Sequence, residues 1–231
     1  MKRILIKLSG EALKGASSTS FSQDIIENIG HQIHALLKKD VQVAVVIGGG
    51  NIFRGKENVS FLDRAQADQM GMLATVMNGL ALKSAFTEKN IPVSLLSSFS
   101  IAGMVDVFSI SRALEAMENK HVVICVGGTG SPYFTTDTAA VLRGIELNCQ
   151  AILKATKVDG VYDADPHHKK NARRFDRLSY QEVLEKGLQV MDSTAITLAA
   201  EHKIPLMVFS LLEKNCFEGV LNNQLTHTVI E

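Results

Sequence analysis

The chain has 231 residues, of which 46% are hydrophobic and 21% charged, a composition typical of a soluble globular protein with one large core. Its 24 basic and 24 acidic residues give a formal net charge of zero, which argues against a broad electrostatic surface for nucleic acid or anionic membranes. A small phosphorylated ligand needs only a few local cations and is compatible with this balance.

Short apolar runs rich in β-branched residues alternate with longer segments of helical periodicity. Strands are predicted at residues 3–8, 41–47, 93–96, 122–126, 151–154 and 206–209. Helices are predicted over residues 24–39, 64–89, 109–119, 136–148, 192–203 and 214–221. Because the two kinds of segment alternate so regularly, we expect an α/β sandwich with a mainly parallel sheet, built as a single domain over residues 1–231.

The sequence carries no signal for a membrane or an oxidising compartment. No apolar run approaches the roughly 20 residues that span a bilayer. Lys7 interrupts the apolar start MKRILIKLSG, which we interpret as a strand rather than a signal peptide. Cys125, Cys149 and Cys216 form no CxxC pair and are expected to be buried thiols. We therefore expect a cytoplasmic protein that binds neither membranes nor nucleic acid.

Three glycine-containing turns directly follow predicted strands: Ser9–Gly10, Gly48–Gly50 and Gly127–Gly130. Ligands of parallel α/β sheets bind at the carboxyl ends of the strands, so these turns should meet at one edge. Backbone N–H groups at such turns bind phosphate when a cation is near, and Lys7 and Arg54 accompany the first two turns. The pattern predicts a phosphoryl-transfer enzyme with one donor site and one acceptor site.

The glycine run at Gly48–Gly50 fits neither G-x-x-x-x-G-K-[ST] nor G-x-G-x-x-G, which disfavours a Walker NTPase and a dinucleotide dehydrogenase. Lys7 stands in an otherwise apolar strand, where an unpaired ammonium is costly to bury, so we favour a functional role at the cleft. By its position alone, Asp68 is interpreted as part of a solvated helix face. His167 and His168 have no partner at metal-ligand spacing and are interpreted as surface residues.

The loop over residues 127–137 combines glycines, hydroxyls and aromatics, which suits a planar ligand lying against backbone. Thr135 or Thr136 can cap the helix that follows, and Asp137 suits its first turn. Residues 154–166 offer hydroxyl, aromatic and carboxylate groups that could hold a nucleoside or could form an ordinary loop.

Several segments together resemble bacterial uridylate kinases of the amino acid kinase superfamily. They are KLSGEAL at 7–13, GGGNIFRG at 48–55, DQMGMLATVMNGLAL at 68–82, GGTGSPYFTTDTAAVLRGIEL at 127–147, KATKVDGVYDADP at 154–166 and the helix start at 190–192. The resemblance covers essentially the whole chain, and residues 68–82 and 128–140 separate this family from relatives that phosphorylate amino acids. It implies the amino acid kinase fold, a three-layer α/β/α sandwich with a mainly parallel central sheet. The N-terminal part would lie mainly on the UMP side and residues from about 135 to 231 mainly on the ATP side.

The resemblance implies transfer of the γ-phosphoryl group of Mg-ATP to UMP, giving UDP and ADP, in pyrimidine nucleotide biosynthesis toward UTP and CTP. We assign catalysis to Lys7, Arg54 and Asp137. The resemblance assigns ATP binding to Lys7, Leu8, Ser9, Gly10, Gly50, Arg54, Thr156, Tyr162 and Asp165. It assigns UMP binding to Gly49, Asp68, Thr129, Gly130, Ser131, Pro132, Tyr133, Phe134, Thr135 and Thr136. Asp68 would hold the ribose hydroxyls, which replaces its interpretation as a solvated residue.

Family members are typically homohexamers built from dimers, activated by GTP and inhibited by UTP. Residues 16–21 read ASSTSF, where family members often carry a glycine-containing segment tied to the GTP effect, so GTP activation stays open. The resemblance implies Mg²⁺ held through the ATP phosphates and water, without a direct protein ligand.

A phosphate acceptor with a second pKa near 6 is mostly ionised at pH 7, so its transfer chemistry needs no general base. We expect Lys7 to neutralise the migrating group, with Arg54 and the Gly49–Gly50 amides on the phosphates. Asp137 would orient a lysine or a metal-bound water, or would cap its helix. Two alternatives stay open: an enzyme of the same fold that phosphorylates glutamate or aspartate, and a nucleotide-binding protein without catalysis. We expect the loop 129–136 to read the base and to favour UMP strongly over CMP.

Overall fold

A computed structural model of the chain describes residues 1–15, 19–53, 61–166, 168–169 and 171–231. Within these ranges the strands are β1 (Arg3–Leu8), β2 (Gln42–Ile47), β3 (Val93–Ser97), β4 (Asp106–Val107), β5 (Val122–Val126), β6 (Ile152–Thr156), β7 (Val161–Tyr162), β8 (Arg174–Phe175), β9 (Arg177–Leu178), β10 (Leu206–Ser210) and β11 (His227–Ile230). The helices there are α1 (Gly10–Lys14), α2 (Gln23–Leu37), α3 (Arg64–Glu88), α4 (Ile110–Glu118), α5 (Thr136–Glu146), α6 (Tyr180–Glu185), α7 (Ser193–His202) and α8 (Cys216–Leu221). Every strand and helix predicted from the periodicity is confirmed, with small shifts at the ends.

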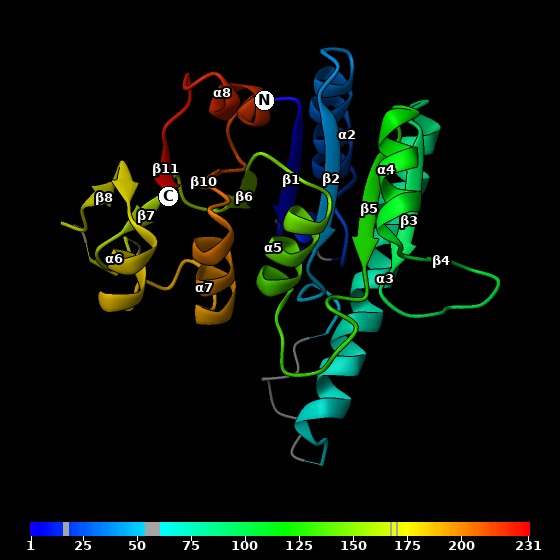
Figure 1. Cartoon of the computed structure of the whole chain (residues 1–231), viewed down its shortest axis with the longest axis horizontal. Coiled ribbons are helices and arrows are strands. Elements are labelled where there is room, and N and C mark those ends of the chain that lie inside the picture. The colour runs from blue at the N-terminus through cyan, green and yellow to red at the C-terminus, as the bar shows by residue number, and fades with distance from the viewer. Residues whose placement is uncertain (16–18, 54–60, 167, 170) are drawn as a thin grey trace.

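The central sheet of the described chain has the strand order β4-β3-β5-β2-β1-β6-β10-β11-β9. Its strand pairs are parallel, except that β11 runs antiparallel to β10. Figure 1 shows β1, β2 and β5 running toward the same edge of the molecule. The turns that follow these strands therefore gather at that edge, as expected for a parallel sheet.

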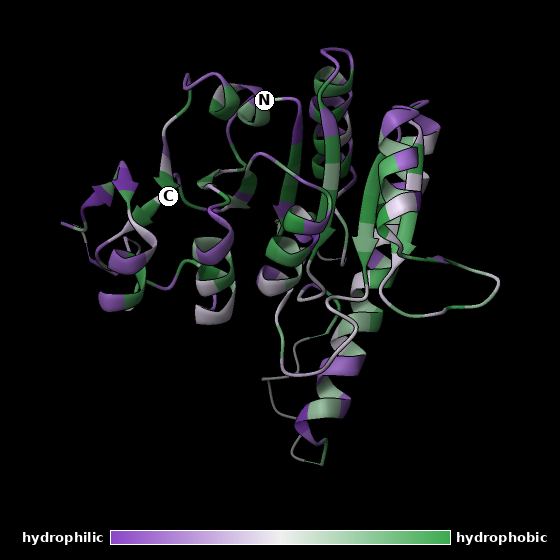
Figure 2. Cartoon of the chain, in the orientation of Figure 1, coloured by the Kyte–Doolittle hydropathy of each residue, from purple (hydrophilic) through white to green (hydrophobic). Residues whose placement is uncertain are grey.

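Hydrophobic side chains leave the two faces of the sheet in alternation and form two cores. Ile4, Ile6 and Leu8 of β1 join one core with residues of α2, α3 and α8. Leu5 joins the second core, which contains residues of α4, α5, α6 and α7. Figure 2 shows the hydrophobic central strands among these helices. The two cores confirm the three-layer α/β/α sandwich, and alternation along β1 puts the side chain of Lys7 on the α5 side.

The structure adds elements that periodicity did not predict: α1, α6, the two-residue strands β4, β7, β8 and β9, and the terminal strand β11. Helix α6 begins with a capping box in which Ser179 and Glu182 bond reciprocally.

Cys125, Cys149 and Cys216 are buried free thiols, as expected. In the described part of the chain, no helix is both long and apolar enough to cross a membrane.

Candidate active site

Lys7, Asp137 and Lys154 form a charge cluster where β1, β6 and the first turn of α5 meet. Lys7 Nζ lies 2.8 Å from Asp137 Oδ1, and Lys154 Nζ lies 2.9 Å from Asp137 Oδ2. Lys154 also donates a hydrogen bond to the carbonyl oxygen of Val190. The three charged side chains are only 10% to 16% exposed. With two ammonium groups and one carboxylate, this lysine–aspartate cluster carries one net positive charge.

The register of the sheet explains why the two lysines meet. Lys7 and Lys154 are paired Cα positions on the adjacent parallel strands β1 and β6, so their side chains leave the same face about 4.8 Å apart. Like charges at that spacing repel, and the carboxylate of Asp137 bridges them. Burial raises the pKa of Asp137, but the ammonium groups of Lys7 and Lys154 outweigh burial and hold the pKa below its ordinary value. Burial lowers the pKa of Lys154, against the opposing pull of Asp137.

Lys154 is a site residue that the sequence analysis did not single out. The signal was present, because Lys154 interrupts the apolar strand AILKAT just as Lys7 interrupts RILIKL. What the sequence did not reveal is the register that brings the two lysines to one carboxylate. The expectation that Asp137 orients a lysine agrees with these contacts.

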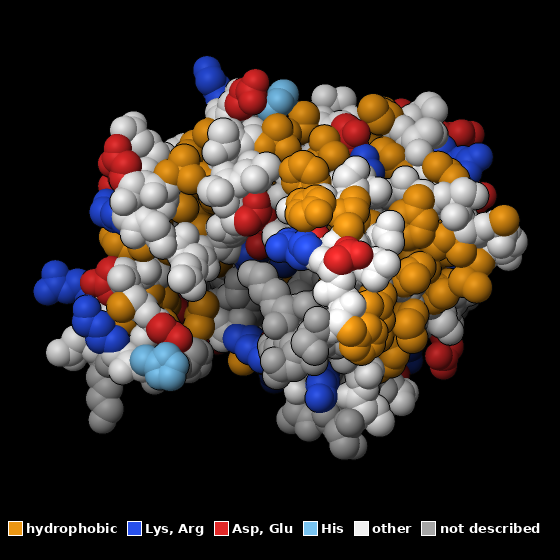
Figure 3. Space-filling model, turned by 90° about the horizontal axis from the view of Figure 1, so that it is seen from below, with side chains coloured by type: hydrophobic (Ala, Val, Ile, Leu, Met, Phe, Trp, Pro, Cys, Tyr) orange, Lys and Arg blue, Asp and Glu red, His pale blue; other side chains and the backbone are white. Residues whose placement is uncertain are grey.

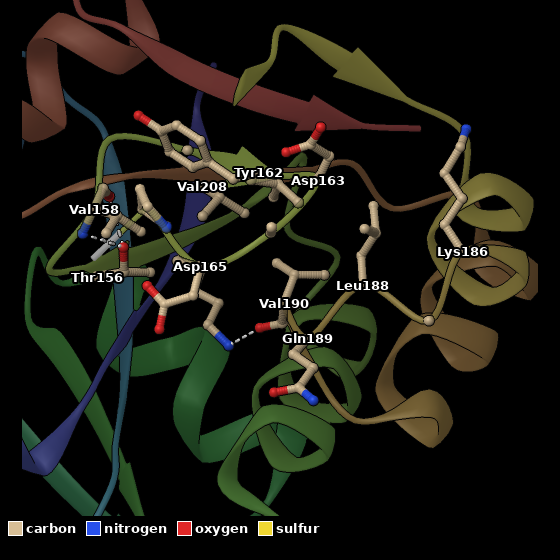
Figure 4. A pocket seen from close by; sticks show the side chains of 16 residues that line it. Thr156, Val158, Tyr162, Asp163, Asp165, Lys186, Leu188, Gln189, Val190 and Val208 are labelled. Atoms are coloured by element: carbon tan, nitrogen blue, oxygen red, sulfur yellow. Dashed lines mark hydrogen bonds between the residues drawn. The ribbon is translucent and has the colours of Figure 1, made fainter. Parts of the chain in front are cut away.

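A cavity of about 570 Å³ opens beside Lys154. Its lining includes Thr156, Tyr162 and Asp165, which the resemblance assigned to ATP, together with residues 186–190. Figure 4 shows Thr156, Tyr162, Asp165 and Val190 around this space. Thr156 Oγ1 donates to Val158 O at 2.7 Å, and Tyr162 donates to Asp159 at 2.6 Å. We call this space the β6-side cavity.

A second cavity, of about 230 Å³, lies between α3 and the turns that follow β2 and β5. Its lining includes the following residues that the resemblance assigned to a ligand: Gly49, Gly50, Asp68, Phe134, Thr135 and Thr136. Thr136, which lines this α3-side cavity, directly precedes Asp137 of the lysine–aspartate cluster. Gly50, which the resemblance assigned to ATP, lines this cavity next to Gly49 and not the β6-side cavity.

Asp68 is not part of a solvated helix face. Its side chain is 20% exposed and pairs with Arg64 at 2.8 Å on the same helix. One of its oxygens accepts a 2.7 Å hydrogen bond from the backbone N–H of Tyr133. Asp68 therefore ties the start of α3 to the loop that follows β5, at the edge of the α3-side cavity.

The loop between β5 and α5 has a positive φ at three glycines and at Tyr133. Gly127, Gly128 and Gly130 have φ values of 79°, 58° and 85°, which glycine adopts without strain. Tyr133 has a φ of 72°, and its side chain is largely exposed. Residues 129–133, which the resemblance assigned to UMP, are not in the lining of the α3-side cavity.

Thr135, rather than Thr136 or Asp137, caps α5. Its side-chain oxygen accepts a 3.0 Å hydrogen bond from the N–H of Asp137. The capping role considered for Asp137 is therefore wrong.

Asp192, missed by the sequence analysis, accepts hydrogen bonds from the hydroxyls of Thr135 and Thr138 and caps α7 through the N–H of Ala195. Its position at a helix start was visible in the sequence, but its partners on α5 were not.

The first two glycine turns touch each other. A Cβ atom on Gly10 would lie 2.5 Å from Asn51 Oδ1 and 2.6 Å from Gly48 O, so a side chain there would separate the turns. Gly48 N donates to Leu8 O at 3.0 Å, and Leu8, which the resemblance assigned to ATP, is fully buried. Arg54, expected beside these turns, lies outside the described residues, as does His167.

Ser9 stands at the start of α1, and its side chain makes no capping hydrogen bond. Among the residues that the structure describes, no group of three or more His, Cys, Asp or Glu side chains is placed to hold a metal ion. Both oxygens of the Asp137 carboxylate are paired with lysines, one with Lys7 and the other with Lys154.

Comparisons with known proteins agree with the fold and with the geometry of the site. The model of the amino acid kinase family matches residues 2–210. The chain belongs to the amino acid kinase family. Within the family, it is 46% identical to a uridylate kinase of Mannheimia succiniciproducens over 99% of this chain and 97% of the relative. It is 47% identical to a uridylate kinase of Marinobacter nauticus over 100% of this chain and 96% of the relative.

Solved structures of amino acid kinase family members superpose closely on the chain. The crystal structure of UMP kinase from Ureaplasma parvum has a TM-score of 0.94 and 38% identity, covering 100% of this chain and 98% of that one. The crystal structure of UMP kinase from Bacillus anthracis has a TM-score of 0.95 and 37% identity, covering 100% of this chain and 96% of that one. These matches confirm the resemblance that the motifs indicated.

Proposed function

We propose that the protein transfers the γ-phosphoryl group of ATP to UMP and produces UDP and ADP. The observation that carries this proposal is the lysine–aspartate cluster, in a chain similar over nearly its full length to uridylate kinases. Lys154 of the cluster lines the β6-side cavity, and Thr136, next to Asp137, lines the α3-side cavity. The β6-side cavity is the ATP site, and the α3-side cavity is the UMP site.

In the reaction, an oxygen of the UMP phosphate attacks the γ-phosphorus while the bond from that phosphorus to the β–γ bridging oxygen breaks. No general base is needed, because the attacking phosphate is already mostly ionised. The obstacle is repulsion between two polyanions, which amounts to about 4 kcal/mol for each pair of unit charges at 4 Å and an effective dielectric of 20. Lys7 and Lys154 offset this repulsion around the migrating group.

Asp137 holds the two lysines in place without touching substrate. Since its carboxylate bridges both ammonium groups at 2.8 and 2.9 Å, the positive charge is positioned before substrate arrives. The same engagement leaves Asp137 unable to serve as a metal ligand. Mg²⁺ would be held through the ATP phosphates and water, as the resemblance implies, and would supply further positive charge there.

The remaining assignments follow the resemblance. Thr156, Tyr162 and Asp165 hold the adenosine part of ATP, and Ser9, Gly10, Gly50 and Arg54 bind phosphates. Asp68 holds the ribose of UMP, and the loop 129–136 reads the uracil. In support, Asp68 combines partial burial with a position on the lining of the α3-side cavity.

The protein also acts as an oligomer in this proposal, a hexamer as implied by the resemblance. In support, Met70, Leu73 and Met77 stand 42%, 52% and 54% exposed at helical spacing along α3. Figure 3 shows hydrophobic side chains gathered on one side of the face that carries the strand ends. A cytoplasmic location and inhibition by UTP complete the proposal, and activation by GTP stays open.

The decisive experiment measures ADP formation from Mg-ATP with UMP, CMP, dUMP, dTMP, glutamate, aspartate or no acceptor. We expect turnover with UMP and far slower turnover with CMP. Turnover on an amino acid would overturn the acceptor while keeping the fold, and ATP binding without any turnover would point to a binding protein. Repeating the assay with GTP and with UTP tests regulation, and gel filtration tests the oligomer.

A further inference from the structure

The inner face of α3 carries two buried polar side chains, Thr75 and Asn78, which are 2% and 0% exposed. Each bonds to a different glycine turn. Thr75 Oγ1 accepts a 2.8 Å hydrogen bond from the backbone N–H of Gly127, at the start of the loop after β5. Asn78 Nδ2 donates a 2.6 Å hydrogen bond to Gly48 O, at the start of the turn after β2.

Asn78 is also half of a reciprocal amide pair with Asn51. Asn78 Nδ2 donates to Asn51 Oδ1 at 2.7 Å, and Asn51 Nδ2 donates to Asn78 Oδ1 at 3.0 Å. Asn51 Nδ2 donates in addition to Ser20 O at 2.9 Å. A fully satisfied buried network of this kind holds one arrangement of the backbone groups it touches.

The amide pair lies where the first two turns meet. Asn51 Oδ1 is the atom that a Cβ on Gly10 would approach to 2.5 Å, so the pair packs directly against the turn after β1. The turn after β2 rests on the same helix, because a Cβ on Gly49 would lie 2.8 Å from both Ala74 Cβ and Gly71 O. Helix α3 is thus a common support for all three turns.

We propose that Asn78 and Thr75 are positioning residues for phosphoryl transfer, which rests on the function proposed above. Asn78, paired with Asn51, sets the turn Gly48–Gly50 against the turn Ser9–Gly10 and so aligns the phosphate sites of donor and acceptor. Thr75 sets the start of the loop after β5 and so acts on the acceptor alone. Asn78 lines neither cavity. Thr75 is on the lining of the α3-side cavity but is only 2% exposed, and its hydroxyl is bonded to the N–H of Gly127 and to Met72 O.

The two residues therefore have different kinetic signatures. Thr75→Val removes the hydroxyl at nearly constant volume and leaves the N–H of Gly127 without its partner. We expect the KM and Kd for UMP to rise about tenfold while those for ATP change less than about twofold. Thr75→Ser keeps the hydroxyl, and we expect values close to wild type.

Asn78→Leu keeps the branched shape of the side chain and removes its donors. We expect the Kd values for ATP and for UMP both to rise and kcat to fall about tenfold or more, because the two phosphate sites lose their mutual alignment. If Asn78→Leu does not fold, Asn51→Ala breaks the same pair from its half-buried end and should shift both substrates in the same direction.

The experiment combines steady-state kinetics with calorimetric titration of ATP and of UMP, after circular dichroism has shown that each variant is folded. Thr87→Val is the matched control, since it makes the same change at an exposed position of the same helix and should leave all constants unchanged. Equal effects of Thr75→Val and Thr75→Ser, or an equal rise for ATP and UMP in Thr75→Val, would overturn the acceptor half of the inference. An unchanged ATP affinity in both Asn78→Leu and Asn51→Ala would overturn the donor half.

These outcomes can be distinguished from failure of the proposed function. If the wild-type protein uses UMP, the variants bear on the positioning inference alone. If the wild type does not bind UMP, the proposed function fails, and the ATP titrations still decide the role of Asn78.

Discussion

Lys7 and Lys154 are register partners on neighbouring parallel strands, and a single carboxylate, that of Asp137, lies within 2.9 Å of both ammonium groups. Backbone pairing in the sheet sets the separation of the two lysines, so the positive charge at the centre is placed by the most rigid part of the fold. The carboxylate offsets the repulsion between the two lysines, because without it two buried ammonium groups would face each other.

Replacement of Asp137 tests the bridging role. We expect Asp137→Asn to lower kcat about 10²-fold or more, because the lysines lose the group that orients them. Unfolding free energy should fall by about 3 kcal/mol, because two nearly buried ammonium groups are left uncompensated. Enzyme assays and urea denaturation measure the two effects. Asp40→Asn, which breaks an exposed pair with Lys120, is the control and should change neither.

Stability should depend on pH through the same carboxylate. The pKa of Asp137 in the folded protein lies below the ordinary value of 3.8. Its contribution is therefore fully present above pH 3.8 and is lost as pH falls through the lower folded-state pKa. We expect the stability difference between wild type and Asp137→Asn to stay constant from pH 7 to about pH 5 and to shrink at pH 3. A difference that grows on acidification would contradict this assignment.

Both lysines should matter to the chemical step. We expect Lys7→Met and Lys154→Met each to lower kcat about 10²-fold, and the double variant to lose less than the product of the two, because the lysines act on one migrating group. Kinetics of the single and double variants check this. Lys39→Met changes a half-exposed lysine paired with Glu218 and should retain full activity. Wild-type kcat in Lys7→Met would refute the catalytic role of that lysine.

Asp68 should govern recognition of the ribose. If its carboxylate holds the sugar hydroxyls, Asp68→Asn should raise the KM for UMP about tenfold or more with little change for ATP. The ratio of kcat/KM for UMP to that for dUMP should fall at the same time, because the deoxy substrate has less to lose. An unchanged ratio would leave Asp68 only a structural role, through its pair with Arg64 and its hydrogen bond to the N–H of Tyr133.

The fold could be predicted from the sequence because alternating strand and helix patterns are long and strongly periodic here. Strands of two residues, such as β7 (Val161–Tyr162), carry no period and are defined only by their pairing. The choice between Thr135 and Thr136 as helix cap was likewise open, because a cap is decided by which hydroxyl meets the free N–H groups.

The candidate site was predictable in part, for a similar reason. Lys7 stood out because a charge in an apolar strand is costly, and Lys154 gave the same signal but was not used. The contacts of Asp192 with Thr135 and Thr138 join segments more than 50 residues apart, and no local pattern encodes them. Assignments of individual residues to ATP or UMP stay predictions until binding is measured.

The loop between β5 and α5 is held at both ends, at Gly127 by the hydroxyl of Thr75 and at Thr135 by its capping bonds to α5. The lysine–aspartate cluster lies on β1, β6 and α5, outside this loop. If the loop reads the acceptor base as proposed, its sequence can change without altering the strands and the helix that carry the lysines and Asp137. Grafting a loop of different sequence between these two anchors would then change the preference for the base and leave the phosphoryl-transfer centre in place. The architecture suits both divergence by loop exchange and laboratory redesign of substrate preference.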